Sequence, residues 1–265
     1  MKTSDKKAFF FDFDGTLWFG KYGEKTLEGL KKLKEKGHLL FYASGRSKGH
    51  TNLERLKPIP FDGFLYGGNH AEVFGNELYR KDVSHIILEK VVNAEKTYGL
   101  DVLYEGVFTS YKHKNFPFKT TGVEFDDVSS VLDCEKYPVT KFCIFKKFTQ
   151  TENGDKTFLP LDEEARQIIS ADFQIVDLDF YYECMLKGTG KDFIVKKVIE
   201  NLNLSPENCY FFGDSMNDFP MFTLGGTNVA IRHAPQKLKE LAHFVTTEEE
   251  NGIYEALVHF GLIDF

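Results

Sequence analysis

The amino-acid sequence predicts an α/β protein in which a smaller α+β domain is inserted into an open domain built on a parallel sheet. Three observations predict this architecture. Short apolar segments alternate with amphipathic helical segments near both ends of the chain, as in repeated strand–helix–strand units. The pattern changes roughly from Asp82 to Leu186, where short aromatic strands are separated by polar segments. The length of 265 residues allows two domains of ordinary size or one large one.

The N-terminal part of the sheet is predicted from two strand and helix pairs. Lys7 to Phe13 is a short apolar run that ends in acidic residues, which is typical of a strand covered on both faces. Leucines recur at helical spacing between Glu24 and Lys36, and Gly37 follows where a C-terminal cap is expected, so this segment predicts a helix. His38 to Ala43 predicts the next strand, and Ser47 to Leu56 predicts a second helix.

The same alternation returns toward the carboxyl end. We expect a helix from about Lys191 to Leu202, a strand from Cys209 to Phe212 and another helix from about Asn217. The pattern then continues as strand, helix, strand and helix over Asn228–Ile231, Gln236–Ala242, His243–Thr246 and Gly252–Phe260.

The middle of the chain predicts the inserted domain. We assign residues 1–81 and 187–265 to the α/β domain and residues 82–186 to the insert, with hinges near residues 80–84 and 185–189 that would let the insert act as a lid. The insert is expected to contain a long helix followed by short aromatic strands, over Val83–Tyr98, Val102–Tyr104, Val107–Tyr111 and Lys141–Phe148.

Composition and charge exclude several function classes. The net charge of −7 argues against nucleic acid as a partner. The apolar run Ala8–Phe11 is too short for a signal sequence or a membrane span, so we expect a cytoplasmic protein without a membrane partner. The four cysteines include no C-x-x-C pair and therefore indicate neither a zinc knuckle nor a thioredoxin-like site.

The segment Phe11-Asp12-Phe13-Asp14-Gly15-Thr16-Leu17 contains the first candidate site residues. Asp12 and Asp14 stand one residue apart where the first predicted strand ends, and ligands of parallel sheets bind at the carboxyl ends of the strands. Residues two apart in an extended chain point to the same side, so both carboxylates could serve one site. Gly15 then allows a sharp turn. Taken alone, this pattern is more often an acidic turn.

The segment Gly213-Asp214-Ser215-Met216-Asn217-Asp218 follows a second apolar strand. Asp214 and Asp218 are four residues apart, so a helix that starts here would place them on one face. Acidic residues at a helix start are ordinarily caps. Carboxylates at the ends of two strands, however, together predict an oxygen-ligand site for a hard cation such as Mg²⁺.

Two further segments carry groups complementary to a phosphate. Ser44 and Gly45 follow the strand His38–Ala43, and the Ser44 hydroxyl with nearby backbone N–H groups could hold a phosphoryl oxygen. Lys191 would lie at the start of a helix, where a solitary cation is unfavourable unless an anion compensates it. The segment before Lys191 is no Walker A loop, because Met185 stands where that motif requires glycine and Asp192 where it requires Ser or Thr.

Four elements of the sequence resemble, in the same order, the four motifs of the haloacid dehalogenase superfamily of phosphohydrolases. They are FDFDGTL, the strand that ends at Ser44, Lys191 and GDSMND. The stretch from Lys187 to Gly252 is especially similar to the Cof-type sugar phosphatases. That resemblance implies a Rossmann-like core with a type IIB α/β cap inserted between the second and third motifs. The Cof-type proteins usually have Asn-Gly-Ala after the third strand, whereas Asn69-His70-Ala71 stands here, which puts the local turn and a substrate contact by Asn69 in question.

The resemblance also implies a role for each site residue. Asp12 would be the nucleophile that forms an aspartyl-phosphate, and Asp14 the general acid and base. Mg²⁺ would be held by the Asp12 side chain, the Asp14 main-chain carbonyl and Asp214. The remaining residues would bind the substrate phosphate (Ser44, Gly45, Lys191 and Asn217), pair with Lys191 or orient the surroundings of the metal (Asp218), or contact the substrate (Asn69).

These expectations predict a Mg²⁺-dependent phosphatase for small phosphorylated metabolites, above all sugar phosphates, acting as a monomer or weak homo-oligomer. A sugar phosphomutase of related architecture would use the same aspartyl-phosphate and is the first alternative. A phospho-acceptor signalling module is the second, although such modules are usually shorter and lack an acid at the place of Asp14. A regulatory protein that has kept the fold without turnover is the third.

Overall fold

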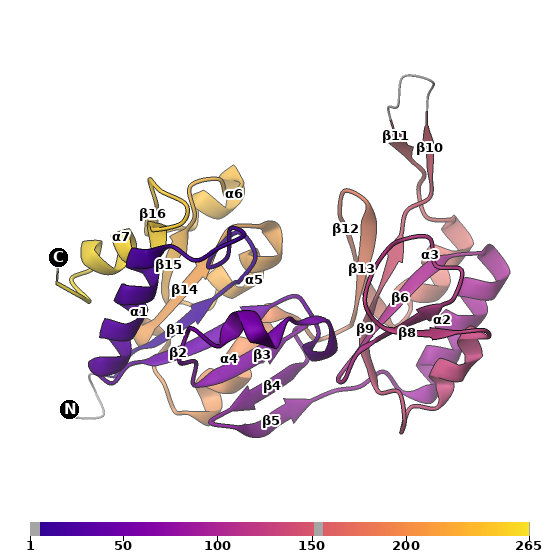
Figure 1. Ribbon diagram of the computed structural model, residues 1–265, viewed down its shortest axis with the longest axis horizontal. Helices are drawn as coiled ribbons and strands as arrows, with labels where there is room; N and C mark the ends of the chain where they lie inside the picture. Colours follow the sequence, from indigo (N-terminus) through magenta and orange to yellow (C-terminus); the bar gives the residue numbers. More distant parts are fainter. Residues whose placement is uncertain (1–5, 151–155, 265) are drawn as a thin grey trace. The chain divides into compact units, whose positions relative to one another are not determined.

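The computed structural model describes residues 6–150 and 156–264, and the chain divides into two compact units. Unit 1 contains the residues up to Gly45, Asn52–Arg80 and the chain from Gly190 onward, and unit 2 contains Arg46–Thr51 and Lys81–Thr189. Figure 1 shows the elements of both units along the chain. Among the described helices, none is both long enough and apolar enough to cross a membrane.

Unit 1 is built on a sheet of eight strands, counted over the described residues, in the order β16-β15-β14-β1-β2-β3-β4-β5. The pairs from β16 to β3 are parallel, and the last two pairs are antiparallel. The strands are β1 (Ala8–Phe11), β2 (Leu39–Ser44), β3 (Gly63–Tyr66), β4 (His70–Val73), β5 (Asn76–Arg80), β14 (Cys209–Gly213), β15 (Thr227–Ala230) and β16 (Phe244–Val245).

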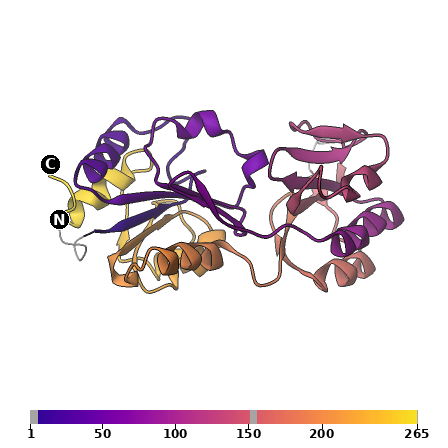
Figure 2. The same cartoon turned by 90° about the horizontal axis from the view of Figure 1, so that it is seen from below.

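Helices cover both faces of this sheet, which confirms the predicted α/β fold (Figure 2). Phe9 and Phe11 of β1 pack in one core with α1 (Glu24–Glu35) and α7 (Gly252–His259). Phe10 points to the opposite face, because side chains alternate along a strand. It packs in a second core with the helices α4 (Lys191–Asn201), α5 (Phe219–Phe222) and α6 (Gln236–Lys239).

Within its described residues, unit 2 has a separate core under a six-stranded sheet in the order β12-β13-β9-β6-β7-β8. The helices α2 (His85–Tyr98) and α3 (Glu163–Ser170) pack on the apolar face of this sheet. The strands of unit 2 are β6 (Asp101–Gly106), β7 (Ser110–His113), β8 (Val123–Phe125), β9 (Val139–Phe145), β12 (Phe173–Asp177) and β13 (Tyr181–Leu186), with a separate pair, β10 (Phe148–Gln150) and β11 (Lys156–Phe158).

The predicted helix from Ser47 to Leu56 is wrong. Two short 3₁₀ turns, Lys48–His50 and Leu53–Leu56, take its place. The Ser47 backbone N–H donates to Glu105 Oε2 (3.1 Å), and a Cβ on Gly49 would lie 2.3 Å from the backbone nitrogen of Thr109. These long-range contacts bind residues 46–51 to unit 2, whereas periodicity reports only local structure.

Three other local predictions differ from the structure. The helix expected from Asn217 is only a 3₁₀ turn, Met216–Asp218, followed by the four-residue α5. The strand expected over Val107–Tyr111 begins at Ser110, since Val107 belongs to the turn between β6 and β7. The helix expected over Gln236–Ala242 ends at Lys239.

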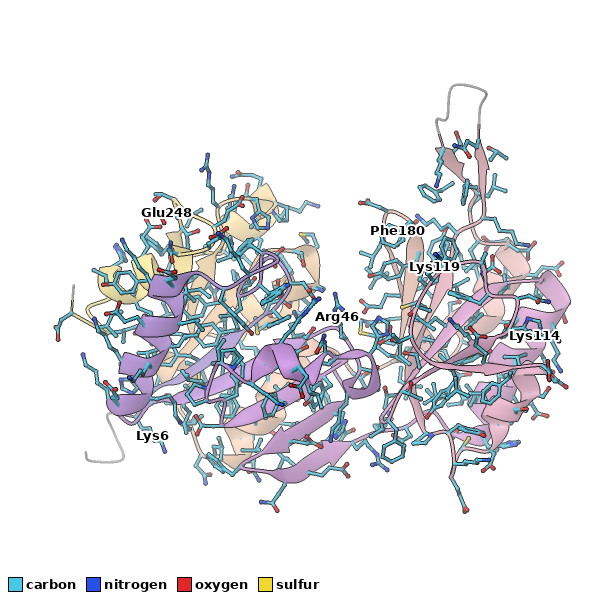
Figure 3. All side chains as sticks on the ribbon, viewed as in Figure 1. Lys6, Arg46, Lys114, Lys119, Phe180 and Glu248 are labelled. Atoms are coloured by element: carbon cyan, nitrogen blue, oxygen red, sulfur yellow. The ribbon has the colours of Figure 1, made fainter. Side chains whose placement is uncertain are left out.

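Charged residues are buried on the face of the unit 2 sheet opposite α2 and α3. Lys141 forms an ion pair with Glu183, and both side chains are more than nine-tenths buried. Lys112 is also buried and donates to the carbonyl oxygen of Thr120 (2.7 Å). Its neighbour Lys114 is half exposed (Figure 3).

A buried carboxyl group in unit 2 makes the stability of the fold depend on pH. Glu95 on α2 is 7% exposed and its Oε2 accepts a hydrogen bond from the Tyr104 hydroxyl (2.6 Å). Burial raises the pKa of Glu95 to about 7, although the Tyr104 hydrogen bond opposes the shift. The folded state therefore favours the protonated form, and its stabilisation is lost as the pH rises through about 7.

We predict that Glu95→Gln stabilises the protein at pH 8.5 by about 2 kcal/mol and changes its stability little at pH 5. Glutamine stays neutral and its carbonyl oxygen still accepts from Tyr104. Urea unfolding of wild type and variant at both pH values measures the effect, with the exposed Glu89→Gln on the same helix as control. An equal effect of Glu95→Gln at both pH values would contradict the prediction.

Candidate active site

Three neighbouring parallel strands of unit 1 end at one edge of the sheet. Phe11, the last residue of β1, lies opposite Phe212 of β14 and Tyr42 of β2. The Asp12 backbone N–H extends the ladder by donating to the Phe212 carbonyl (2.9 Å). The register therefore brings to this edge the side chains that follow β1 and β14, together with Ser44 at the end of β2.

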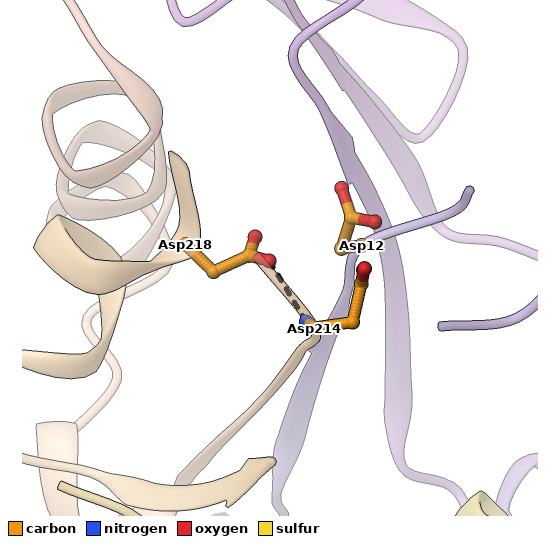
Figure 4. A group of neighbouring side chains, drawn as sticks. All are labelled: Asp12, Asp214 and Asp218. Atoms are coloured by element: carbon orange, nitrogen blue, oxygen red, sulfur yellow. Dashed lines mark hydrogen bonds between the residues drawn. The ribbon is translucent and has the colours of Figure 1, made fainter. Parts of the chain in front are cut away.

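Three carboxylates gather at this edge (Figure 4). One oxygen from each of Asp12, Asp214 and Asp218 lies within 4.8 Å of the others. Asp12 is 5% exposed and Asp218 is fully buried, whereas Asp214 is half-buried. Among the described residues, this is the only group of three or more acidic, histidine or cysteine side chains spaced to hold a metal ion.

Lys191 supplies the positive charge of the cluster. It is the first residue of α4, as predicted, and it is buried. Its Nζ donates to Asp12 Oδ1 (2.6 Å) and to Asp218 Oδ1 (2.5 Å), with Asn217 Oδ1 at 3.3 Å. The ammonium group thus joins residues that lie 179 and 27 positions away in the sequence.

Asp218 reaches the cluster through a capping loop. The prediction that Asp214 and Asp218 share one face of a helix is wrong. Asp218 Oδ2 accepts hydrogen bonds from the backbone N–H groups of Asp214 (3.0 Å) and Ser215 (3.1 Å), and the Ser215 side chain completes a capping box. Asp214 precedes the 3₁₀ turn and lies outside any helix. Because Asp218 is engaged by these donors and by Lys191, Asp12 and Asp214 are the carboxylates best placed to hold a cation.

The electrostatics of the cluster fit a divalent cation. Three carboxylates and one ammonium group leave two negative charges when all four groups are ionised. Burial raises the pKa of Asp12 well above its ordinary value; Lys191 opposes this shift and the nearby carboxylates add to it. Burial, followed by the charge of Asp218, likewise raises the pKa of Asp214. A hard cation with oxygen ligands, such as Mg²⁺, would offset this excess charge.

The Lys191 amine stays protonated in this environment. Burial by itself disfavours the ammonium form, but the charges of Asp12 and Asp218 outweigh it and raise the pKa of Lys191 above its ordinary value. A permanently charged donor at this position can neutralise part of the charge on an anionic ligand.

The orientation of Asp214 depends on two residues that the sequence did not single out. Thr16 Oγ1 donates to Asp214 Oδ1 (2.8 Å), and His233 Nε2 lies 3.3 Å from Asp214 Oδ2. Gly15 adopts a φ of +84°, and a Cβ there would lie 2.6 Å from Asp214 Oδ2, so only glycine fits. Thr16 belongs to the first acidic motif, so its place in that motif could have indicated it as a site residue. No pattern in the sequence indicated His233.

The other predicted site residues lie in the turns at or near this edge. Asp14 is half-buried and forms an isolated bridge with Trp18. Ser44 is buried, and its carbonyl accepts from the Gly67 N–H (2.9 Å). Asn69 is fully buried in the turn after β3. The phosphate-binding roles of Ser44 and Gly45 and the substrate contact of Asn69 stay predictions.

His70 lies in a strand. It stands where the Cof-type proteins usually have glycine. It is buried, begins β4 and pairs with Arg80 across the sheet. Its Nε2 lies 3.4 Å from Glu77 Oε2 and 3.6 Å from Glu72 Oε1. The exchange of glycine for histidine is therefore accommodated by packing and by two acidic neighbours.

Two relatives with names of their own match nearly the whole of this chain. A Streptococcus pyogenes protein provisionally named a bifunctional phosphatase/peptidyl-prolyl cis-trans isomerase is 27% identical over 276 residues, which cover 99% of this chain and 56% of that protein. The chain thus spans little more than half of that relative. The Bacillus subtilis protein YkrA, provisionally named a phosphatase, is 29% identical over 273 residues, which cover 98% of this chain and 99% of YkrA.

Comparison of structures and of family profiles completes the assignment. The structure of BT4131, described as a haloacid dehalogenase subclass IIB sugar phosphatase, superposes with a TM-score of 0.74 and 23% identity, covering 97% of this chain and 100% of that chain. At this identity the similarity establishes the shared fold. The profile of the haloacid dehalogenase-like hydrolases matches residues 9–257. Since this match includes nearly the whole chain and both parts of the acidic cluster, the chain belongs to the haloacid dehalogenase-like hydrolases.

Proposed function

We propose that this hydrolase is a Mg²⁺-dependent phosphatase that cleaves small phosphorylated metabolites, most of all sugar phosphates, through an aspartyl-phosphate on Asp12. The observation that carries the proposal is the cluster at the strand ends, where Asp12 contacts the Lys191 ammonium and lies within 4.8 Å of Asp214. It combines a carboxylate nucleophile, a fixed positive charge and oxygen ligands for a cation. Phosphoryl transfer through an aspartyl-phosphate uses these three components.

Asp12 and Lys191 would carry the first step. The Asp12 carboxylate would attack phosphorus and expel the alcohol, which splits one slow hydrolysis into two easier displacements. Lys191 Nζ, 2.6 Å from Asp12 Oδ1, would hold the nucleophile in place and attract the phosphate dianion. Ser44, Gly45 and Asn217 would donate to the remaining phosphoryl oxygens.

Asp14 would move the protons. It would protonate the departing alkoxide and then deprotonate the water that releases phosphate from Asp12. Asp12, the Asp14 main-chain carbonyl and Asp214 would hold Mg²⁺, which neutralises charge on the phosphoryl group. Asp218 would act through Lys191, because its two oxygens are engaged by that ammonium and by two backbone N–H groups.

The sugar-phosphate preference is supported by the fold shared with BT4131, which is described as a sugar phosphatase. We propose further that residues 82–186 form the domain that selects the substrate, and that the enzyme is cytoplasmic and acts as a monomer or weak homo-oligomer. A screen of hexose phosphates, pentose phosphates, nucleotides and pyridoxal phosphate with Mg²⁺ tests the substrate class. Isomerisation of a sugar phosphate without release of phosphate would instead identify a phosphomutase.

Replacing the nucleophile should abolish turnover. We predict that Asp12→Asn lowers the rate of aryl phosphate hydrolysis more than ~10³-fold, because an amide cannot form the aspartyl-phosphate. Circular dichroism of the same preparation checks that the fold is intact. Activity retained by a folded Asp12→Asn protein would refute the nucleophile assignment.

Replacing the proton donor should slow the reaction without removing the nucleophile. We predict that Asp14→Asn reduces kcat for a sugar phosphate by about 10²–10⁴-fold, because neither the alkoxide nor the attacking water is then assisted. Rapid-quench measurements should show the phosphoenzyme accumulating, or its formation slowed. Turnover equal to that of wild type would exclude the proton-transfer role.

Removing Asp218 should destabilise the core of unit 1. We predict that Asp218→Ala lowers the free energy of unfolding by about 3 kcal/mol, because two partly buried N–H groups and the buried Lys191 ammonium lose their acceptor. Urea unfolding measures the change, and the exposed Glu207→Ala serves as a control expected to stay within about 0.5 kcal/mol of wild type. Equal stability of wild type and Asp218→Ala would show that the loop does not depend on this carboxylate.

A further inference from the structure

His233 is held at the edge of the acidic cluster by the backbone of the loop after β15. The Ile231 N–H donates to the Gly213 carbonyl (3.0 Å), and the Arg232 N–H donates to Thr246 Oγ1 (3.0 Å). The Ala234 N–H closes the turn by donating to the Ile231 carbonyl (2.8 Å). Hydrogen bonds on both sides of His233 therefore fix the position from which its side chain extends.

The imidazole ring lies between two carboxylates. Nε2 is 3.3 Å from Asp214 Oδ2, and Nδ1 is 3.4 Å from Oε1 of Glu249. Phe19 meets the ring edge-on, with 6.0 Å between ring centroids. The ring is 39% exposed and borders an open pocket of about 630 Å³ that the residues from Thr247 to Asn251 also line. Glu248 in this loop is labelled in Figure 3.

Each oxygen of Asp214 contacts a group that can donate a hydrogen bond. Thr16 Oγ1 donates to Oδ1 from the turn after β1. A carboxylate can only accept, so the contact on Oδ2 is a hydrogen bond when His233 carries its proton on Nε2. Two donors from different loops fix the plane of the carboxylate, whereas one donor alone would leave it free to rotate about that contact.

We propose that His233 is a positioning residue for the metal ligand Asp214. Its Nε2–H holds Oδ2 so that the carboxylate is already oriented toward Asp12 before a cation arrives. This inference rests on the proposed function, because it concerns the same Mg²⁺ site. Hydrogen-bond partners that orient metal ligands commonly contribute 10–100-fold to metal affinity.

The charge of the cluster explains why such a donor matters. Asp214 shares a partly buried space with Asp12 and Asp218, and repulsion among the three carboxylates favours rotation of the most exposed one away from the others. Asp214 is that residue. Without the His233 contact, Mg²⁺ binding would have to order Asp214 at the moment of binding, which weakens the affinity.

The test compares His233→Ala with His233→Gln. Glutamine places an amide N–H near the position of the histidine Nε2 and should restore the hydrogen bond, whereas alanine removes it. His85→Ala, an exposed histidine at the start of α2 in unit 2, is the matched control. Thermal unfolding of each metal-free variant confirms that it is folded.

Calorimetric titration of the metal-free proteins with Mg²⁺, without substrate, gives the decisive readout. We predict that His233→Ala raises the Kd for Mg²⁺ about tenfold, that His233→Gln stays within about threefold of wild type, and that His85→Ala does not change it. The Mg²⁺ concentration that half-activates aryl phosphate hydrolysis should rise in parallel for His233→Ala, and added Mg²⁺ should recover the lost rate.

Each other outcome overturns the proposal in a recognisable way. An unchanged Kd in His233→Ala, with wild type binding Mg²⁺ and hydrolysing phosphate, refutes the role of His233 and leaves the proposed function intact. Equal weakening in the alanine and glutamine variants refutes orientation through a donated hydrogen bond. A wild-type protein that neither binds Mg²⁺ nor releases phosphate overturns both the inference and the proposed function.

Discussion

One buried ammonium group holds the candidate site together. Lys191 Nζ contacts Asp12 and Asp218, so it joins the end of β1 and the loop after β14 to the start of α4. Burying a charged side chain without a partner costs several kcal/mol, and one cation among three carboxylates balances only part of their charge. The site is therefore stable enough to form in the folded chain, yet it retains an excess of negative charge that suits a divalent cation.

The backbone provides the geometry that this charge requires. The parallel order β14-β1-β2 brings the carboxyl ends of three strands to one edge, and helices on both faces exclude water from the strands themselves. Glycine at position 15 lets Asp214 approach the turn after β1, and Asp218 accepts from the backbone of the loop that carries Asp214. Asp214 is thus accommodated by the turn after β1, whereas Asp218 is held by the backbone of its own loop.

The inserted unit has its own core and its own buried charges. Its apolar residues pack under α2 and α3, whereas Lys141 and Glu183 pair on the opposite face of the sheet. Residues 46–51 directly follow Ser44 and Gly45 along the chain, yet their contacts assign them to unit 2, where Glu105 accepts from the Ser47 N–H. The segment next to the proposed phosphate-binding residues is therefore anchored in the unit proposed to select the substrate.

The sequence by itself determined the fold class and the meeting of Asp12 and Asp214, because apolar runs that end in polar residues mark the carboxyl ends of buried parallel strands. The family and the place of Lys191 in the site followed from the resemblance of the sequence motifs to the haloacid dehalogenase superfamily. The sequence by itself misjudged residues 47–56 and the path of Asp218, and it passed over His233 and the burial of Lys112. Local periodicity carries no information about which distant partner will form a hydrogen bond with a backbone group or a carboxylate. Only the tertiary structure decided that Glu105 would hold the Ser47 N–H, that a capping loop would bring Asp218 to Lys191, and that His233 would reach Asp214, because these contacts join residues 58, 27 and 19 positions apart.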